Sequence, residues 1–245
     1  MNGYKEFSIG LTRVVQNIIL PIPETDRIGM RTSLSNLLYD KDEPVKFMEE
    51  YNSEDRAPIE LFHVMFEIET SVQNLLDTEI YIRRFPFTKT RVTKVRYLRY
   101  VFVNYLSEVY LLKQRLKSFL KLVDDLYANG NKRKEVRKVT QPLFQLVAMA
   151  FENIVTARSL HVHKEIYSDK QLDKLGILES ISKHDKENEN QFSWLGYFGW
   201  QYREIRSQKT KQIKEMNQEI ERVLDHFFSK LHPIVFDDEM NVVRV

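Results

Sequence analysis

An arginine and two histidines lie within six positions of one another in the segment Thr156–Glu165, which reads TARSLHVHKE. These residues are Arg158, His161 and His163. A guanidinium holds a phosphate through paired hydrogen bonds and stays charged, whereas an imidazole can carry a proton near neutral pH. Together they are the minimum set of groups for cutting a phosphodiester without a metal ion. The segment therefore predicts phosphodiester chemistry, provided that the surrounding elements bring these groups together.

Composition narrows the classes of protein that the 245-residue chain can belong to. It has no cysteine, which excludes a disulfide framework and a thiolate zinc site. Its 37 basic and 35 acidic residues give a net charge of +2, so a nucleic-acid partner must bind a local basic patch. No stretch approaches the roughly 18 apolar residues that span a bilayer, and no secretory signal pattern opens the chain. We therefore expect a cytoplasmic protein without membrane contact.

The spacing of apolar residues predicts an all-α fold. Only seven glycines and seven prolines interrupt the chain, which favours long helices over short strands. Residues 1–57 are broken by prolines and are predicted as an N-terminal extension of short helical pieces, followed by a bundle over 58–232 and a tail over 233–245. The predicted bundle helices cover about 59–83, 88–128, 132–161, 170–182 and 192–232. The expected architecture is an up-and-down bundle of long helices with a smaller N-terminal elaboration.

The helix predicted over 88–128 has the clearest pattern. Its apolar residues alternate spacings of three and four at Val95, Leu98, Phe102, Tyr105, Val109, Leu112, Leu116, Phe119, Val123 and Leu126. Such a seam fits a dimerising coiled coil or the central helix of an antiparallel bundle, and we favour the bundle because the other helices also need a packing surface. Further along, Ser168-Asp169 is predicted to provide the N-cap of the helix over 170–182. In the last helix the apolar stripe lapses between Ile205 and Ile213, which is typical of a helix facing a polar cleft.

The helical frame, together with the segment Arg158-Ser-Leu-His-Val-His163, resembles the HEPN family. The motif of this family is an arginine, four to six further residues and a histidine, and in many members it reads Arg-Asn-x-x-Val-His. Val162 and His163 match the end of that form, whereas Ser159 stands where asparagine, aspartate or histidine is more usual. The resemblance covers about residues 58–232 and implies a HEPN-like helical bundle.

The resemblance also implies metal-independent RNA cleavage by a homodimer in which the motifs of two subunits meet, with no cofactor. His163 would act as general base on the ribose 2′-hydroxyl or as general acid to the leaving 5′-oxygen. Arg158 would brace the scissile phosphate, and Ser159 would orient it by a hydrogen bond. The implied setting is a toxin–antitoxin, abortive-infection or phage-defence system, with an antitoxin or regulatory protein as a further partner. No DNA specificity is expected.

The geometry of a helix makes His161 a second candidate for the catalytic histidine. On an ideal helix Arg158 and His163 lie about 140° apart, whereas Arg158 and His161 are separated by only about 60°. Arg158 and His163 therefore converge only if the helix ends or bends, or if they meet across a dimer. His161 is the alternative catalytic residue.

Basic and aromatic residues around the motif are candidates for RNA contacts. Lys164 and Tyr167 follow the motif directly, and Arg203, Arg206 and Lys209 lie in the last helix. Further basic clusters occupy residues 91–99 and 132–138, although a solvated helix surface is the favoured explanation of each cluster. The aromatic set Trp194, Tyr197, Phe198 and Trp200 either stacks on bases or belongs to the core. The alternative function is a catalytically silent helical bundle that binds a protein or RNA partner.

Overall fold

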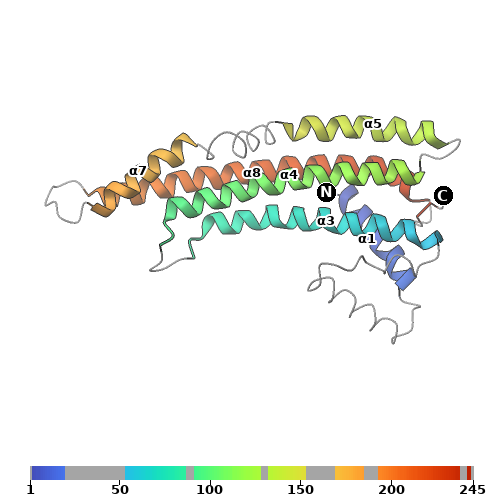
Figure 1. The fold of residues 1–245 in the computed structure, drawn as a ribbon, viewed down its shortest axis with the longest axis horizontal. Coiled ribbons are helices and arrows are strands. Elements are labelled where there is room, and N and C mark those ends of the chain that lie inside the picture. The colour runs from blue at the N-terminus through green and yellow to red at the C-terminus, as the bar shows by residue number, and fades with distance from the viewer. Residues whose placement is uncertain are drawn as a thin grey trace, which may run out of the picture. The chain divides into compact units, whose positions relative to one another are not determined.

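The computed structural model describes residues 2–19, 53–86, 91–127, 132–152, 169–184, 193–237 and 242–243. In this part of the chain the regular elements are all helices (Figure 1). In addition, Phe236 and Val242 form one isolated antiparallel bridge. They are α1 (Asn2–Ile19), α3 (Ser53–Arg83), α4 (Lys94–Tyr127), α5 (Arg133–Ala150), α7 (Lys170–His184) and α8 (Trp194–Val235). The prediction of an all-α bundle of long helices is confirmed. None of these helices is long and apolar enough to cross a membrane.

Two prolines that were used as predicted boundaries lie inside helices. α3 begins at Ser53 and includes Pro58, and α8 continues through Pro233 to Val235. Both prolines are close to a helix end, where the missing N–H group and the bulky ring disturb only a short part of the hydrogen-bond ladder. The predicted limits at residues 58 and 232 are therefore not the limits of these helices.

The apolar seam of α4 is buried, as its spacing predicts. Each seam residue from Val95 to Val123 is at most 4% exposed, and only at the end does Tyr127 replace Leu126 in the core. α4 also buries Val101, Leu106 and Leu120, which lie beside the seam. This apolar face is wider than a two-stranded coiled-coil seam, as the central helix of a bundle requires.

Contacts divide the chain into two compact units, and the first contains residues 1–67, 115–145 and 224–245. Its core is aromatic: the ring of Phe7 lies 4.9 Å from Phe228, 5.0 Å from Phe236 and 5.8 Å from Phe119, measured between centroids. Helix α1 and Phe236 therefore pack in the same core. The limits of this unit do not coincide with the boundaries predicted at 57 and 232.

The start of α1 makes close contact with α8. The backbone N–H of Gly3 donates a hydrogen bond of 2.8 Å to Asp225 Oδ1, so this carboxylate caps α1 from another helix. A Cβ atom at Gly3 would lie 1.9 Å from Ser229 Oγ and 2.9 Å from the carbonyl oxygen of Asp225. Only a glycine permits this approach.

The second unit contains residues 68–114 and 146–223, and a satisfied polar network lies in its core. The Tyr105 hydroxyl donates to Asn217 Oδ1 at 2.8 Å, and Asn217 Nδ2 donates to the Leu75 carbonyl at 3.1 Å and to Glu79 Oε1 at 3.0 Å. Burial raises the pKa of Tyr105 well above its usual value, and the charge of Glu79 adds to this, so the phenol remains a donor. The network favours one register of α3, α4 and α8, because any shift would leave buried polar groups without partners.

Candidate functional site

The predicted catalytic residues Arg158, Ser159, His161 and His163 lie outside the described residues, as do Lys164 and Tyr167. The structure describes the chain on both sides of them, in the second unit. Before the segment, α5 ends at Ala150 and the following Phe151 is 1% exposed. After it, the description resumes at Asp169.

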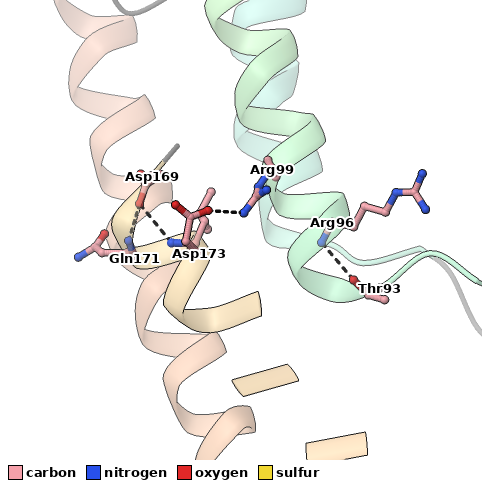
Figure 2. A network of polar contacts seen from close by, with 7 residues as sticks. Thr93, Arg96, Arg99, Asp169, Gln171 and Asp173 are labelled. Atoms are coloured by element: carbon pink, nitrogen blue, oxygen red, sulfur yellow. Dashed lines mark hydrogen bonds and ion pairs between the residues drawn. The ribbon is translucent and has the colours of Figure 1, made fainter. Parts of the chain in front are cut away.

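Asp169 is held by three hydrogen bonds. Its Oδ1 atom accepts from the backbone N–H groups of Gln171 at 2.9 Å and Leu172 at 3.2 Å, which confirms it as the N-cap of α7 (Figure 2). Its Oδ2 atom forms an ion pair with Lys209 Nζ, and the two side chains are only 11% and 9% exposed. Asp169 thus links the start of α7 to α8.

Lys209 occupies the position at which the apolar stripe of α8 lapses. Ile205 and Ile213 are buried on either side of it, and Lys209 itself is only 7% exposed. Its Nζ atom lies 5.0 Å from the centroid of the Phe102 ring, so the lysine fills the gap in the core and carries its charge to Asp169. The expectation of a polar cleft between Ile205 and Ile213 is wrong, because a buried ion pair occupies this place. Lys209 was predicted to contact RNA, but its ammonium group forms an ion pair with the Asp169 carboxylate.

The pKa of Asp169 reflects two opposing effects. Burial on its own raises the pKa of this carboxyl, but the hydrogen bond and charge of Lys209 and the two backbone N–H groups outweigh it, so the pKa is lowered. Because the folded-state pKa lies below the unfolded-state value of about 4, the ionised carboxylate stabilises the fold above that pH. This contribution is lost as the pH falls through the lowered folded-state pKa.

Replacing Asp169 with asparagine is expected to test this pair. Asn is also a good N-cap, but it lacks the charge that compensates Lys209. We expect a loss of about 1–3 kcal/mol in the free energy of unfolding at pH 7, and a smaller difference from the wild type below about pH 4. Urea unfolding at pH 7 and at pH 2.5–4 measures both values. A difference that stays constant over this range would contradict the assignment.

The other predicted basic residues of α8 have different surroundings. Arg203 is exposed. The Arg206 Nη1 atom donates to the Arg83 carbonyl at 3.2 Å, and its guanidinium carbon lies 5.4 Å from the centroid of the Tyr202 ring. Lys94 Nζ lies 5.5 Å from the same centroid. Cations from α4 and α8 thus meet at one aromatic ring.

The predicted aromatic platform at the start of α8 is divided between core and surface. Phe198 is buried, whereas Trp200 is 53% exposed and Tyr197 is 36% exposed. The Tyr197 and Trp200 rings lie 6.1 Å apart with an interplanar angle of 33°. Of the four predicted residues, Tyr197 and Trp200 are exposed, Trp194 is half-buried and Phe198 belongs to the core.

A cavity of about 360 Å³ lies between the start of α4 and α7, and we term it the basic pocket. Its lining consists of Thr93, Val95, Arg96, Arg99, Gly176, Glu179, Ser180 and Lys183. Three lining residues are cations, and one, Glu179, is an anion. The Glu179 carboxylate is already engaged, because it accepts from the backbone N–H groups of Lys94 at 3.0 Å and Val95 at 3.3 Å.

The cations of the basic pocket differ in how firmly they are held. Arg99 Nη2 lies 2.6 Å from Asp173 Oδ1, one helical turn after Asp169 (Figure 2). Arg96 is exposed, and in Figure 2 its side chain extends away from Asp169 and Asp173. Within the described ranges neither Arg96 nor Lys183 has a carboxylate partner. Exposed cations beside the hydroxyl of Ser180 can bind phosphate oxygens, and the arrangement supports anion binding.

The sequence identified part of this pocket. The cluster at residues 91–99 contains Arg96 and Arg99, but nothing in the sequence connected Lys183 with them, because it lies more than eighty positions later in another helix. Over the described part of the chain, no three histidine, aspartate or glutamate side chains gather as a metal site. No family model matches the chain, and comparisons with curated proteins and with solved structures gave no significant match.

Proposed function

We propose that this protein is a metal-independent endoribonuclease of the HEPN type that cleaves RNA through Arg158 and His163. One observation supports the proposal most directly: the segment carrying both residues joins α7 at Asp169, one turn before the Asp173 that holds Arg99 of the basic pocket. His163 is six residues from Asp169, so the two residues are at most about 22 Å apart. The proposal is that the motif acts on an RNA backbone bound at the basic pocket.

The proposed reaction transfers the phosphodiester within the RNA. A histidine removes the proton of the 2′-hydroxyl, the 2′-oxygen forms a bond to the adjacent phosphorus, and the bond from phosphorus to the 5′-oxygen breaks. A second histidine protonates the leaving 5′-oxygen, so the products are a 2′,3′-cyclic phosphate and a 5′-hydroxyl. In a homodimer the two copies of His163 can fill the two roles. Arg158 stabilises the charge on the phosphate oxygens, and Ser159 donates a hydrogen bond to one of them.

The biological setting that goes with this activity is a toxin or phage-defence system in the cytoplasm. A nuclease that cuts cellular RNA has to be restrained, which is why an antitoxin or regulatory protein is part of the proposal. The RNA is the substrate, and a second copy of the chain is the expected partner.

An RNA cleavage assay in excess EDTA tests the proposal. Wild-type protein is expected to cut an unstructured RNA to products with 2′,3′-cyclic phosphate ends, and to leave the same sequence intact when every 2′-oxygen is methylated. The methylated strand is the control, because it removes the nucleophile and keeps the phosphates. Cleavage that requires an added metal ion, or that also occurs in the methylated strand, would rule out this mechanism.

A second candidate function is a catalytically silent module that binds a partner protein. Large apolar side chains are exposed on α7 and at the start of α8: Ile177 is 62% exposed, Leu195 is 67% exposed and Trp200 is 53% exposed. Exposed apolar groups of this size are frequent in protein interfaces. Stable binding of a protein partner without any RNA cleavage would favour this second function.

A further inference from the structure

A second cavity, of about 390 Å³, is lined by residues of α3 and α4, and we term it the tyrosine pocket. Three tyrosines line it, Tyr81, Tyr97 and Tyr100, together with the amides of Asn74 and Asn104. Tyr81 is 53% exposed and Tyr100 is 63% exposed, although both are large aromatic side chains. Two open aromatic faces beside two amide groups form a surface that suits a planar polar ligand.

Tyr97 is the anchored member of the three. Its hydroxyl donates to the Tyr81 carbonyl at 3.2 Å, and its ring lies 5.6 Å from Phe85 in an edge-to-face arrangement. Burial raises the pKa of Tyr97 above its usual value, and the nearby hydroxyls of Tyr81 and Tyr100 raise it further. The phenol therefore stays uncharged at physiological pH and does not repel a polyanion.

The polar groups of the tyrosine pocket can read the edge of a base. Each asparagine offers two N–H donors and one carbonyl acceptor, and both Asn74 and Asn104 are exposed. Glu108 also lines the pocket and accepts a hydrogen bond of 2.7 Å from the Ser71 hydroxyl. Unpaired RNA bases are commonly recognised by stacking on aromatic rings, with hydrogen bonds to their Watson–Crick edges.

Helix α4 connects the two pockets. Arg96 and Arg99 line the basic pocket, whereas Tyr97 and Tyr100 line the tyrosine pocket. Arg96 and Tyr100 are four residues apart, which places them about 40° apart around the helix and about 6 Å apart along its axis. One face of α4 therefore presents Arg96 next to the exposed ring of Tyr100. In the described part of the chain Arg96 has no carboxylate partner. A strand with charged phosphates and stackable bases matches this alternation better than a peptide does.

We propose that the tyrosine pocket binds an unpaired nucleobase of RNA, stacked on Tyr100, while a neighbouring phosphate of the same strand contacts Arg96. The choice of RNA rests on the proposed function, and the inference defines its substrate as single-stranded. A base inside a duplex is stacked and paired already, so it cannot enter the pocket.

Binding of a labelled 2′-O-methyl RNA tests the inference, because this strand resists attack by a 2′-oxygen. Fluorescence anisotropy with the full-length protein in EDTA is expected to show that the single strand binds more tightly than a duplex of the same sequence. Tyr100→Leu is expected to weaken single-strand binding by about 5- to 150-fold, since it removes the stacking ring. Tyr100→Phe keeps the ring and is expected to bind within about twofold of wild type.

Phe66→Leu is the matched control, because Phe66 is also an aromatic residue with a largely exposed side chain, 58% exposed, and it does not line the tyrosine pocket. Its affinity for the single strand is expected to equal that of the wild type. Since Tyr100 is largely exposed, Tyr100→Leu is expected to unfold at the wild-type temperature, which separates a loss of binding from a loss of folding.

Three results would overturn the inference: equal affinity for duplex and single strand, unchanged affinity in Tyr100→Leu, or an equal loss of affinity in Phe66→Leu. The last result would show that the loss is not specific to the tyrosine pocket. Binding that depends on Tyr100, without cleavage of ordinary RNA, would keep the base site and reject the nuclease. Cleavage of RNA that does not depend on Tyr100 would keep the nuclease and reject the base site.

Discussion

His163→Ala is expected to lower the rate of RNA cleavage by about 10²–10⁴-fold, because a positioned acid or base contributes about that much to a proton-transfer step. Single-turnover cleavage in EDTA, with protein in excess over RNA, measures this change without a contribution from product release. The variant is expected to bind 2′-O-methyl RNA as tightly as the wild type. A proton-transfer role thus affects the rate and leaves the affinity unchanged.

His161→Ala is the matched control for this experiment, since it removes the same side chain two positions earlier. It is expected to cleave RNA near the wild-type rate. If His161→Ala loses activity and His163→Ala retains it, the catalytic role belongs to His161, which shares a helix face with Arg158 on an ideal helix. Cleavage that survives the loss of both histidines would contradict the mechanism.

Phe7→Ala is expected to reduce the free energy of unfolding by about 3–5 kcal/mol, the usual cost of removing a buried phenylalanine ring. Phe7 is fully buried, and its ring contacts those of Phe119, Phe228 and Phe236. Urea unfolding followed by circular dichroism measures the loss. The cavity would open among helices α1, α4 and α8, so the whole first unit is expected to weaken.

Ile9→Ala provides the control in the same helix, because Ile9 is 52% exposed. It is expected to change the free energy of unfolding by no more than about 0.5 kcal/mol. If Phe7→Ala were as mild as Ile9→Ala, α1 would be an appendage, as the sequence suggested. The packing of Phe7 predicts the opposite.

The features that were predicted from the sequence are local ones. The burial of the α4 seam follows from the spacing of side chains within a single helix, so residues Val95 to Val123 could be assigned without any partner. The same holds for Asp169, since an N-cap is defined by the few residues after it. For this reason the fold class and the long helices could be predicted from the sequence.

The features that were missed depend on contacts between distant segments. A lysine in an apolar stripe reads as a solvent-facing residue, and only the position of Asp169 explains why Lys209 is buried. Prolines and polar residues in 1–57 suggested a separate extension, but the burial of Phe7 depends on rings that come more than one hundred positions later. The basic pocket likewise needs Lys183 from α7 beside Arg96 from α4.

The cap that Asp225 gives to the first turn of α1 has a consequence for biosynthesis. The two partners of this hydrogen bond are 222 positions apart, and ribosomes add about 5–20 residues per second, so Gly3 waits about 10–45 s for Asp225 to be made. Throughout that interval the nascent chain presents Phe7 without the rings of Phe228 and Phe236, two of those that later enclose it. Aggregation of the nascent chain would be prevented if a chaperone bound it at this stage. It would also be prevented if the first unit folded only after translation had passed Phe236.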